Sequence, residues 1–264
     1  MGFVYPLRKY FHDAAYLALA SGLCGSLTTF SSWNHDMAYT LWIAESFGIS
    51  LLGWIEGLAA SLHALCLGAA LAAVVEPLFR GRKGSEPLGR WLPVVLVAAA
   101  LLTTLITLLI DADMALPWVL AALIFGPIGA IVRYALAKRL NPALPSFKGE
   151  TGQYKVLWPF PGTLLANALG ALVACFCYLM EQAADADGNT VLAALSIGLG
   201  GCLSTVSRFA LEGGLLAATG AFRVVMNGEG DTAGWNRVKA AFGYTFLTIF
   251  LAQVIALPLV LPTK

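Results

Sequence analysis

The chain has 264 residues, of which 59% are hydrophobic and 12% are charged, and its formal net charge is +1. A soluble domain carries about 25% charged residues, so this composition excludes an ordinary soluble domain and indicates an integral membrane protein in contact with the lipid bilayer. No basic stripe with interleaved aromatic residues is present, so we expect no nucleic-acid partner.

Seven apolar stretches are long enough to cross a bilayer, which takes about 20 residues. They predict transmembrane helices over residues 13–33, 50–75, 92–110, 116–137, 160–180, 190–211 and 239–261. The connecting segments alternate between basic and acidic, starting from a basic N-terminus. The positive-inside rule therefore places the N-terminus in the cytoplasm and the C-terminus outside.

One phrase occurs twice in these apolar surroundings. Residues 22–33 read GLCGSLTTFSSW, and residues 198–209 read GLGGCLSTVSRF. Glycine-broken, hydroxyl-rich helices are tolerated at membrane depth only where they face protein or line a water-filled path. Two such segments at matching places in two halves point to the binding site of a transport protein.

The predicted topology gives the two copies opposite directions. The first copy runs from inside to outside and the second from outside to inside, because they lie in the first and the sixth of seven alternating spans. The helix at 92–110 lies between the halves, and we interpret it as a linker whose function is topological. The sequence thus predicts an all-α membrane protein made of two inverted units and a linker helix, with broken helices at the repeated phrase.

The same residues resemble a known family. Residues 22–33 look like the third-helix signature of the Fluc (CrcB) fluoride channels. In the second half, residues 126–134 resemble the first helix of that family, residues 161–170 the second, and Tyr244 with Thr248 the fourth. Two inverted units joined by a linker helix are the architecture of the two-domain eukaryotic fluoride exporters, so the resemblance covers most of the chain.

The resemblance implies three regions. Residues 116–264 look like one complete four-helix Fluc-like unit, and residues 79–115 hold the linker with its helix at 92–110. Residues 1–78 look like a partial first unit with only the third and fourth helices, which lacks the counterpart of Asn167. We therefore expect a pseudo-dimer within one chain, whose first pore needs the two missing helices or a second chain.

The function implied by the resemblance is passive export of fluoride across the plasma membrane, down its electrochemical gradient and without catalytic residues. Fluoride is strongly hydrated, and a pore must replace its water with donors that release it again. Neutral hydroxyl and amide groups supply such donors. The candidates are Asn167, Thr29, Ser31, Thr205, Ser207, Tyr244 and Thr248.

Aromatic ring edges carry partial positive charge and can also face an anion. Family pores pair aromatic side chains from the two inverted units, which here predicts Phe30 with Phe209, and Trp33 with Val206. Because Val206 is not aromatic, we expect one working and one degenerate pore. Arg133 either lines a pore vestibule, as the resemblance implies, or extends to the membrane surface.

The repeated breaks also predict a cation site. The family holds a central structural Na⁺ with main-chain carbonyls, which by resemblance would be those of Gly25 and Thr28 in the first copy and Gly201 and Ser204 in the second. The alternative is that the glycines only allow close helix packing.

Other interpretations remain open from the sequence. Asn167 can instead join two helices by a hydrogen bond, and Arg208, where the family has a small residue, can extend to the cytoplasmic surface. Glu56 and His63 share a helix face and form either a proton relay or two unconnected polar residues. A proton-coupled small-molecule exporter would need two membrane-embedded carboxylates, and we expect only Glu56. A non-transporting membrane subunit is the remaining alternative.

Overall fold

The computed structural model describes residues 5, 7–10, 16, 19–20, 24, 28–42, 46–79, 102, 124–141, 160–181, 186–227 and 232–260. Within these residues the chain forms helices with short connections and no strand, which confirms the all-helical class for the described part. In chain order the elements are η1 (Arg8–Tyr10), α3 (Phe30–Trp42), α4 (Phe47–Phe79), α7 (Gly126–Leu140), α8 (Pro161–Glu181), α9 (Ala186–Ala194), η4 (Leu195–Gly200, a π-helical segment), α10 (Gly201–Leu203), α11 (Val206–Asn227) and α12 (Thr232–Val260).

Four helical stretches in the described residues are long and apolar enough to cross a membrane. They are Phe47–Pro77, Pro161–Glu181, Gly188–Ala218 and Gly234–Ala256. These agree with the predictions at 50–75, 160–180, 190–211 and 239–261. Of the predicted linker helix at 92–110, only Leu102 is described, so the expected count of seven is not tested.

Several predicted boundaries are wrong. Helix α11 continues to Asn227 and α12 already begins at Thr232, so most of the expected connection at 212–238 is helical. In the first half, α3 begins at Phe30 and runs to Trp42, through residues predicted to lie in a connection. Hydropathy detects only the apolar length of a helix, and polar turns that extend it look like loops.

Helix α12 has a buried face and an exposed face, which carry different kinds of side chain. Tyr244, Thr248 and Ala252 recur every four residues and are all buried. Phe246 and Phe250 lie on the opposite face of the helix. They are exposed and stack on each other with ring centroids 5.7 Å apart. Since residues four apart share a helix face, polar and small side chains point inward and large apolar ones point out, as expected for a helix that faces lipid.

Small residues bring the helices of the second half into close contact. An added Cβ on Gly170 of α8 would lie 2.8 Å from the Gly200 carbonyl oxygen, and one on Gly129 of α7 would lie 2.7 Å from that of Leu199. Small residues at membrane helix interfaces allow such approach of backbones. Glycines 129 and 170 therefore fix α7 and α8 against the segment that precedes the second break.

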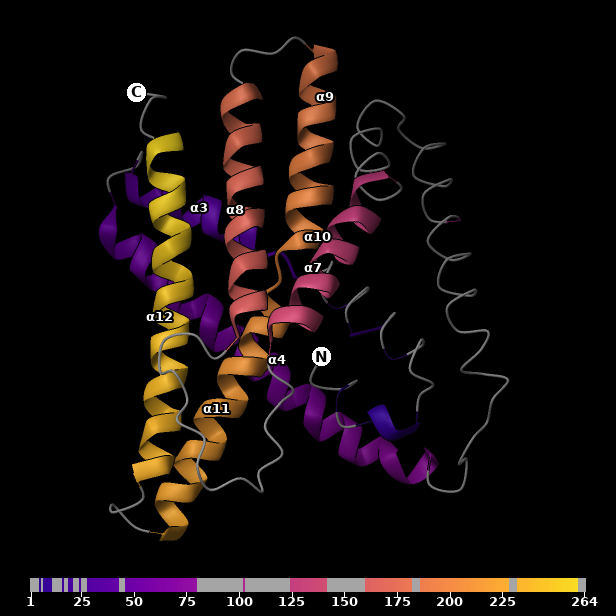
Figure 1. The fold of residues 1–264 in the computed structure, drawn as a ribbon, viewed down its shortest axis with the longest axis vertical. Helices are drawn as coiled ribbons and strands as arrows, with labels where there is room; N and C mark the ends of the chain where they lie inside the picture. Colours follow the sequence, from indigo (N-terminus) through magenta and orange to yellow (C-terminus); the bar gives the residue numbers. More distant parts are fainter. Residues whose placement is uncertain are drawn as a thin grey trace.

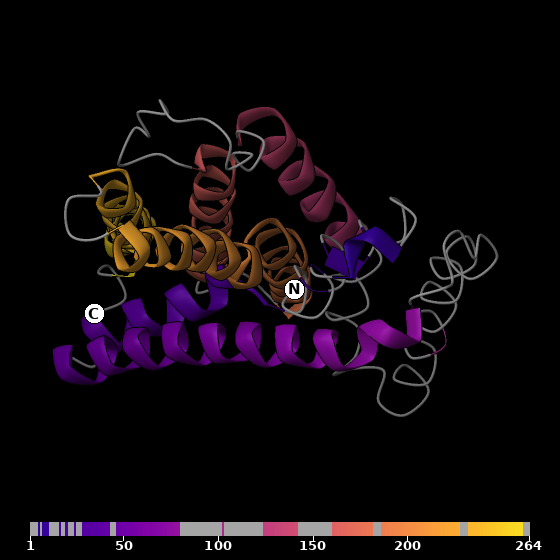
Figure 2. The same cartoon turned by 90° about the horizontal axis from the view of Figure 1, so that it is seen from below.

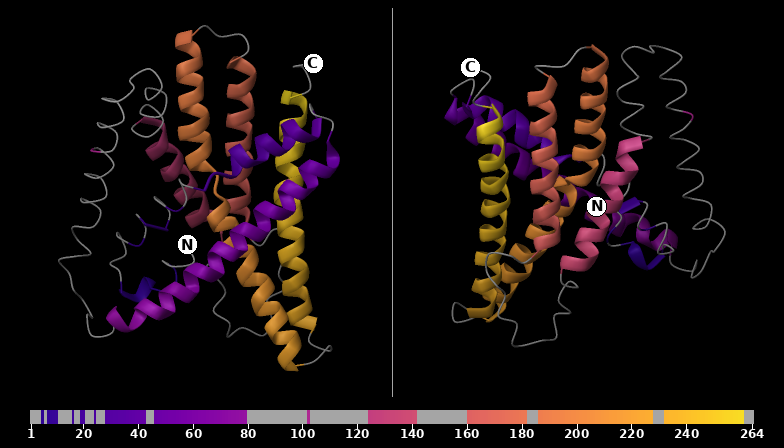
Figure 3. Two further views of the ribbon diagram at one scale, coloured as in Figure 1. Left: turned by 180° about the vertical axis from the view of Figure 1, so that it is seen from behind. Right: turned by 45° about the horizontal axis from the view of Figure 1, so that its top comes forward.

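The helices meet around the two copies of the repeated phrase. In Figure 1, α8, α9 and α12 stand side by side, while α11 leaves the end of α10 at an angle and descends beside α12. Figure 2 shows α3 and α4 together along one side of α11, and Figure 3 (left) shows α4 crossing α11 and α12 obliquely. The main apolar core joins five helices at this crossing: Phe30, Trp54, Phe160, Leu164, Ala171, Phe209, Leu216, Ala241, Tyr244 and Ala252.

Candidate ion pathway at the two helix breaks

The second copy of the phrase is a helix break, and the break lies at its hydroxyl residues. Gly200 and Gly201 keep helical backbone angles, whereas Ser204 is extended and α11 starts anew at Val206. The sequence predicts a glycine-broken helix; the break is present, but the glycines lie in the helix before it. They serve close packing there, as shown for Gly200 and Gly170.

The start of α11 is fully capped. The Thr205 N–H donates to Asn167 Oδ1 at 2.7 Å, and the Val206 N–H donates to the Thr28 carbonyl at 2.9 Å. The Ser207 N–H donates to Thr28 Oγ1, and the Arg208 N–H donates to Thr205 Oγ1. The N–H groups that a helix start leaves without intrahelical partners all have acceptors here.

The start of α3 repeats part of this arrangement. Its Ser32 N–H donates to Thr29 Oγ1 at 3.3 Å, which matches the Arg208–Thr205 bond of the second copy. Its Ser31 N–H donates to Ser204 Oγ at 2.9 Å, which matches the bond from Ser207 to Thr28. Each copy thus supplies a hydroxyl that caps the helix of the other. The described residues supply no acceptor for the N–H groups of Thr29 and Phe30.

An aromatic contact joins the two helix starts. The rings of Phe30 and Phe209 lie edge to face with centroids 5.8 Å apart, and both side chains are buried. The structure therefore brings this predicted pair together. Trp33 instead packs on Trp54 of α4, with centroids 4.4 Å apart, and on Phe30. Whether either arrangement lines a pore stays a prediction.

Most of the predicted donor groups are present near the breaks, but several are already engaged. Asn167 is fully buried and bonds the N–H and the carbonyl of Thr205. Thr248 donates to the carbonyl of Tyr244, one turn earlier. Thr205 and Ser207 share a hydroxyl–hydroxyl bond of 3.2 Å, and the Ser207 hydroxyl also reaches the Cys24 carbonyl.

The hydroxyls of the first copy are less engaged. The oxygens of Thr29 and Ser31 accept bonds from the Ser32 N–H and the Ser204 hydroxyl. The described part of the chain contains no acceptor for the protons of Thr29 and Ser31 themselves. Counted among the described residues alone, two hydroxyl protons and two backbone N–H groups of the first copy thus have no acceptor beside Phe30.

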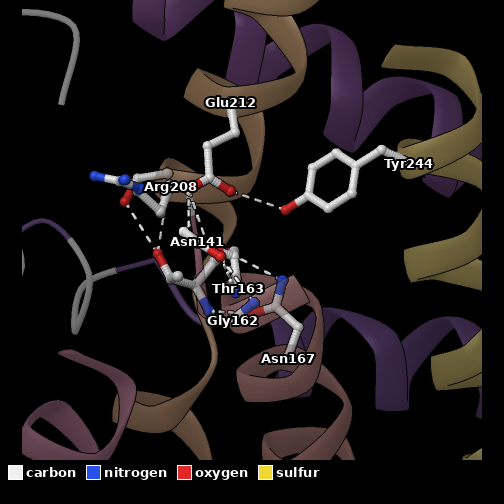
Figure 4. A network of polar contacts seen from close by, with 9 residues as sticks. Asn141, Gly162, Thr163, Asn167, Arg208, Glu212 and Tyr244 are labelled. Carbon is white, nitrogen blue, oxygen red and sulfur yellow. Dashed lines mark hydrogen bonds and ion pairs between the residues drawn. The ribbon is translucent and has the colours of Figure 1, made fainter. Parts of the chain in front are cut away.

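A buried carboxylate that the sequence interpretation missed lies beside this region. Glu212 of α11 is 1% exposed, and its Oε2 accepts the hydroxyl proton of Tyr244 at 2.9 Å. Its Oε1 accepts from Thr163 at 3.0 Å, from Asn141 at 3.1 Å and from Arg208 at 2.6 Å. Figure 4 shows Tyr244 approaching the carboxylate from one side and Arg208 from the other.

One signal in the sequence identifies Glu212. It follows Arg208 by four residues, the spacing of an ion pair on one helix face. It also stands at the end of the predicted span at 190–211, where an acidic residue is easily assigned to a loop. The expectation that the second half contains no membrane-embedded acid is therefore wrong. Glu56, the expected partner acid of an exporter, is exposed on α4, so the two carboxylates do not form a pair.

The two arginines in question are not surface anchors. Arg133 of α7 is 5% exposed and donates to the carbonyl of Ser204 at 3.2 Å. Arg208 is bonded to Glu212, with 30% of its side chain exposed. The interpretation that either side chain simply extends to the membrane surface is wrong, because both bond to buried groups. A vestibule role for Arg133 is not tested.

The predicted Na⁺ ligands are present only in part. Gly25 lies outside the described residues. The carbonyls of Thr28 and Ser204 lie at the two breaks, but they already accept bonds from the Val206 N–H and from the Arg133 guanidinium. The Arg133 guanidinium on the Ser204 carbonyl adds positive charge where a metal ion would bind. The described carbonyl oxygens therefore fit Na⁺ incompletely.

Glu56 and His63 face away from the breaks. Both side chains are exposed on α4, and no hydrogen bond or ion pair joins them. Their shared helix face is thus an outer face in the described structure, which gives no support to a proton relay between them.

Comparison with known proteins agrees with the predicted family. Residues 120–258 match the family described as CrcB-like protein, Camphor Resistance (CrcB). The chain is also 28% identical over 231 residues to Fluoride export protein 1 of Neurospora crassa, a match that covers 75% of this chain and 42% of that protein. The chain therefore spans less than half the length of this relative. No solved structure matches it.

Proposed function

Because this chain belongs to the CrcB-like protein family, we propose that it is a passive fluoride channel that exports fluoride down its electrochemical gradient. The family match and the similarity to a fluoride export protein support fluoride as the ion. The family is one of channels and exporters, so we propose no catalytic step. We further propose the plasma membrane as its location.

One observation carries the proposal: donors without net charge surround the buried contact of Phe30 with Phe209. The N–H groups of Thr29 and Phe30 and the hydroxyls of Thr29 and Ser31 can replace water around a small anion. A helix N-terminus also attracts negative charge. Neutral donors hold fluoride weakly enough to release it, which conduction needs.

We propose one working pore, beside Phe30 and Phe209, and one degenerate pore, beside Trp33 and Val206. The packing of Trp33 on Trp54 and over Gly57 supports the assignment of the degenerate pore, because the indole ring fills space against α4. In the working pore, ring edges and first-copy hydroxyls would contact fluoride. Arg133 would contribute positive charge near the Ser204 carbonyl.

We also propose that the two units are inverted and joined by the helix at 92–110, with boundaries at residues 78 and 115. The reciprocal caps support this arrangement, because matching bonds run from each copy to the other. The N-terminus would be cytoplasmic and the C-terminus outside. Labelling single cysteines from each side of the membrane, placed near residues 84 and 184, tests the orientation; labelling of both from one side would contradict it.

A structural Na⁺ between the breaks is a further part of the proposal. The carbonyls of Gly25, Thr28, Gly201 and Ser204 would hold it, and its charge would stabilise the meeting of the two breaks. Because Arg133 already supplies charge there, we expect only a small fall in unfolding temperature when Na⁺ is replaced by N-methylglucamine. No change would remove Na⁺ from the proposal.

The decisive experiment is fluoride efflux from liposomes containing the purified chain, measured with a fluoride electrode. We expect fast fluoride release and no chloride release under the same gradient. Co-expression with a second copy or with the first two helices of a relative tests the need for a partner if the purified chain is silent. Equal release of both anions would contradict selectivity, and no release in either form would contradict the function.

A further inference from the structure

Arg208 and Glu212 form an ion pair inside the protein, one turn apart on α11. Their Nε–Oε1 distance is 2.6 Å, and Glu212 is 1% exposed. Removing a carboxylate from water is costly, and a buried carboxylate is stable only with charged or strong hydrogen-bond partners. The pair therefore determines whether Glu212 carries an uncompensated negative charge.

Of the residues that hydrogen-bond Glu212, only Arg208 carries a positive charge. Asn141, Thr163 and Tyr244 each donate one bond to the carboxylate, and all three are neutral. These neutral bonds fix the position of the carboxylate but leave its charge in place. Cancelling the charge depends on the guanidinium.

The pair lies next to the proposed fluoride pathway. Tyr244, bonded to Glu212, packs against Phe209 with ring centroids 5.5 Å apart. Phe209 in turn contacts Phe30, with centroids 5.8 Å apart. The carboxylate is thus separated from the aromatic pair by one tyrosine side chain.

The first copy contains no such pair. Position by position, Ser32 and Asp36 stand where Arg208 and Glu212 stand. The Asp36 side chain is 74% exposed and lies 3.8 Å from His35, so water screens its charge. The buried acid and its arginine are therefore a property of the second copy only.

We propose that Arg208 is a specificity-determining positioning residue: it neutralises Glu212, so that the fluoride pathway beside Tyr244 carries no fixed negative charge. This inference rests on the proposed function of fluoride conduction. An uncompensated carboxylate about 8 Å from the ion would repel fluoride strongly enough to lower its occupancy by more than about tenfold at an effective dielectric constant near 20. Arg208 removes that penalty at every pH at which Glu212 is ionised.

Among the residues that the structure describes, few ionisable groups lie near the pair. On α12, Tyr244 faces Glu212, and its phenol is ordinarily neutral below about pH 9. Tyr16 is close enough to Arg208 to act on it electrostatically. Helix α4 also packs against α11, but its Glu56 and His63 are exposed. Loss of Arg208 would thus leave Glu212 as the group that titrates beside the pathway.

The test compares fluoride efflux from liposomes at pH 7.5 and pH 6.0, with release from protein-free liposomes subtracted at each pH. For Arg208→Gln we expect flux at pH 7.5 at least about tenfold below that of the natural chain, rising as the pH falls and Glu212 binds a proton. The natural chain should show no such rise. Arg208→Lys should keep most of the flux, because it keeps the charge.

The double variant Arg208→Gln with Glu212→Gln distinguishes the effect of the uncompensated charge from the effect of changing the side-chain shape. It removes both charges, and we expect it to recover most of the flux lost in Arg208→Gln. Arg139→Gln, which removes a positive charge from the exposed end of α7, is the matched control and should leave flux unchanged. Normal flux in Arg208→Gln, or equally low and pH-independent flux in the single and double variants, would overturn the proposal.

A second measurement does not depend on fluoride transport. Thermal unfolding in detergent should show Arg208→Gln less stable at pH 8 than at pH 6, since its buried carboxylate is then charged without a cationic partner. The double variant should lose this pH dependence. If neither the natural chain nor its co-expressed form releases fluoride, the proposed function fails. If Arg208→Gln unfolds at the same temperature at both pH values, the proposal that Arg208 neutralises Glu212 fails.

Discussion

The two copies of the repeated phrase start their helices in the same way, but they differ in how many of their N–H groups have acceptors among the described residues. Both begin a new helix at a Thr that caps its own third N–H, and each receives a hydroxyl cap from the other. The second start is fully occupied, with acceptors from Asn167 and Thr28. The first start keeps two N–H groups without acceptors in the described part of the chain.

The two copies therefore share the way their helices start, while only the second has acceptors among the described residues for all of its N–H groups. The second copy stabilises the junction: its N–H groups are capped, and its buried acid is paired with Arg208. The first copy presents Phe30, Thr29 and Ser31 to the same junction. This asymmetry is what the proposal of one working and one degenerate pore requires.

The largest expected effect comes from Asn167→Asp. Asp would keep an acceptor for the Thr205 N–H but would place a negative charge at a buried site beside the second break. A charge about 5 Å from an anion path costs roughly 3 kcal/mol at an effective dielectric constant of 20, so we expect flux to fall by at least about 100-fold. Liposome efflux of protein that remains monodisperse in detergent measures this.

Asn34→Asp is the matched control for that change. Asn34 is equally buried, but it lies within α3 and bonds Ala252 and Gln253 of α12 rather than a helix start. We expect a much smaller loss of flux from Asn34→Asp. Unchanged flux in Asn167→Asp, or equal losses in both variants, would remove Asn167 from the pathway.

The next effect distinguishes the two aromatic sites. Phe30→Leu keeps an apolar side chain but removes the ring edge that faces Phe209, and we expect about fivefold lower flux, in line with an aromatic contact worth about 1 kcal/mol. Trp33→Leu should change flux by less than about twofold by the same scale, because Trp33 packs on Trp54. The reverse pattern in liposome efflux would show that the pore beside Trp33 is the working one.

The sequence alone predicts the class of protein, the repeat and its principal contact. The family resemblance pairs Phe30 with Phe209, and the repeat places the hydroxyls of Thr28 and Ser204 at equivalent positions. The position of the helix break is harder to predict from the sequence. A glycine costs a helix only about 1 kcal/mol, and packing at Gly200 offsets this cost, while a Ser–Thr pair with partners across the junction ends the helix.

Glu212 and the length of α11 could not be predicted from hydropathy. The apolar window ends near residue 211, and hydropathy gives no information about partners that lie on other helices. The carboxylate is buried because Asn141, Thr163 and Tyr244 converge on it from α12 and from the ends of α7 and α8. Only the spacing of Arg208 and Glu212 signals the pair within a single helix.

A packing test compares Gly170 of α8, which packs against the second break, with Gly201 of α10, which precedes that break. A Cβ on Gly170 would lie 2.7 Å from Ser204 Cβ, so Gly170→Ala should lower the free energy of unfolding by about 1–3 kcal/mol through overpacking. Gly201→Ala meets only the Thr29 side chain, at 3.4 Å, and should be neutral or slightly stabilising. Unfolding in detergent monitored by circular dichroism checks this, and equal destabilisation by both would contradict close packing at Gly170.

The smallest expected effects concern the reciprocal hydroxyl caps at the two helix starts. Thr28→Val removes the hydroxyl that caps α11, and Ser204→Ala removes the one that caps α3. Each should cost about 0.5–2 kcal/mol of stability, as helix caps do. We expect the smaller loss from Thr28→Val, because the Thr28 carbonyl still accepts the Val206 N–H. Both bonds between α3 and Ser204 use the Ser204 hydroxyl, so Ser204→Ala removes them together. A larger loss from Thr28→Val would reverse the assignment of the second copy as the stabilising one.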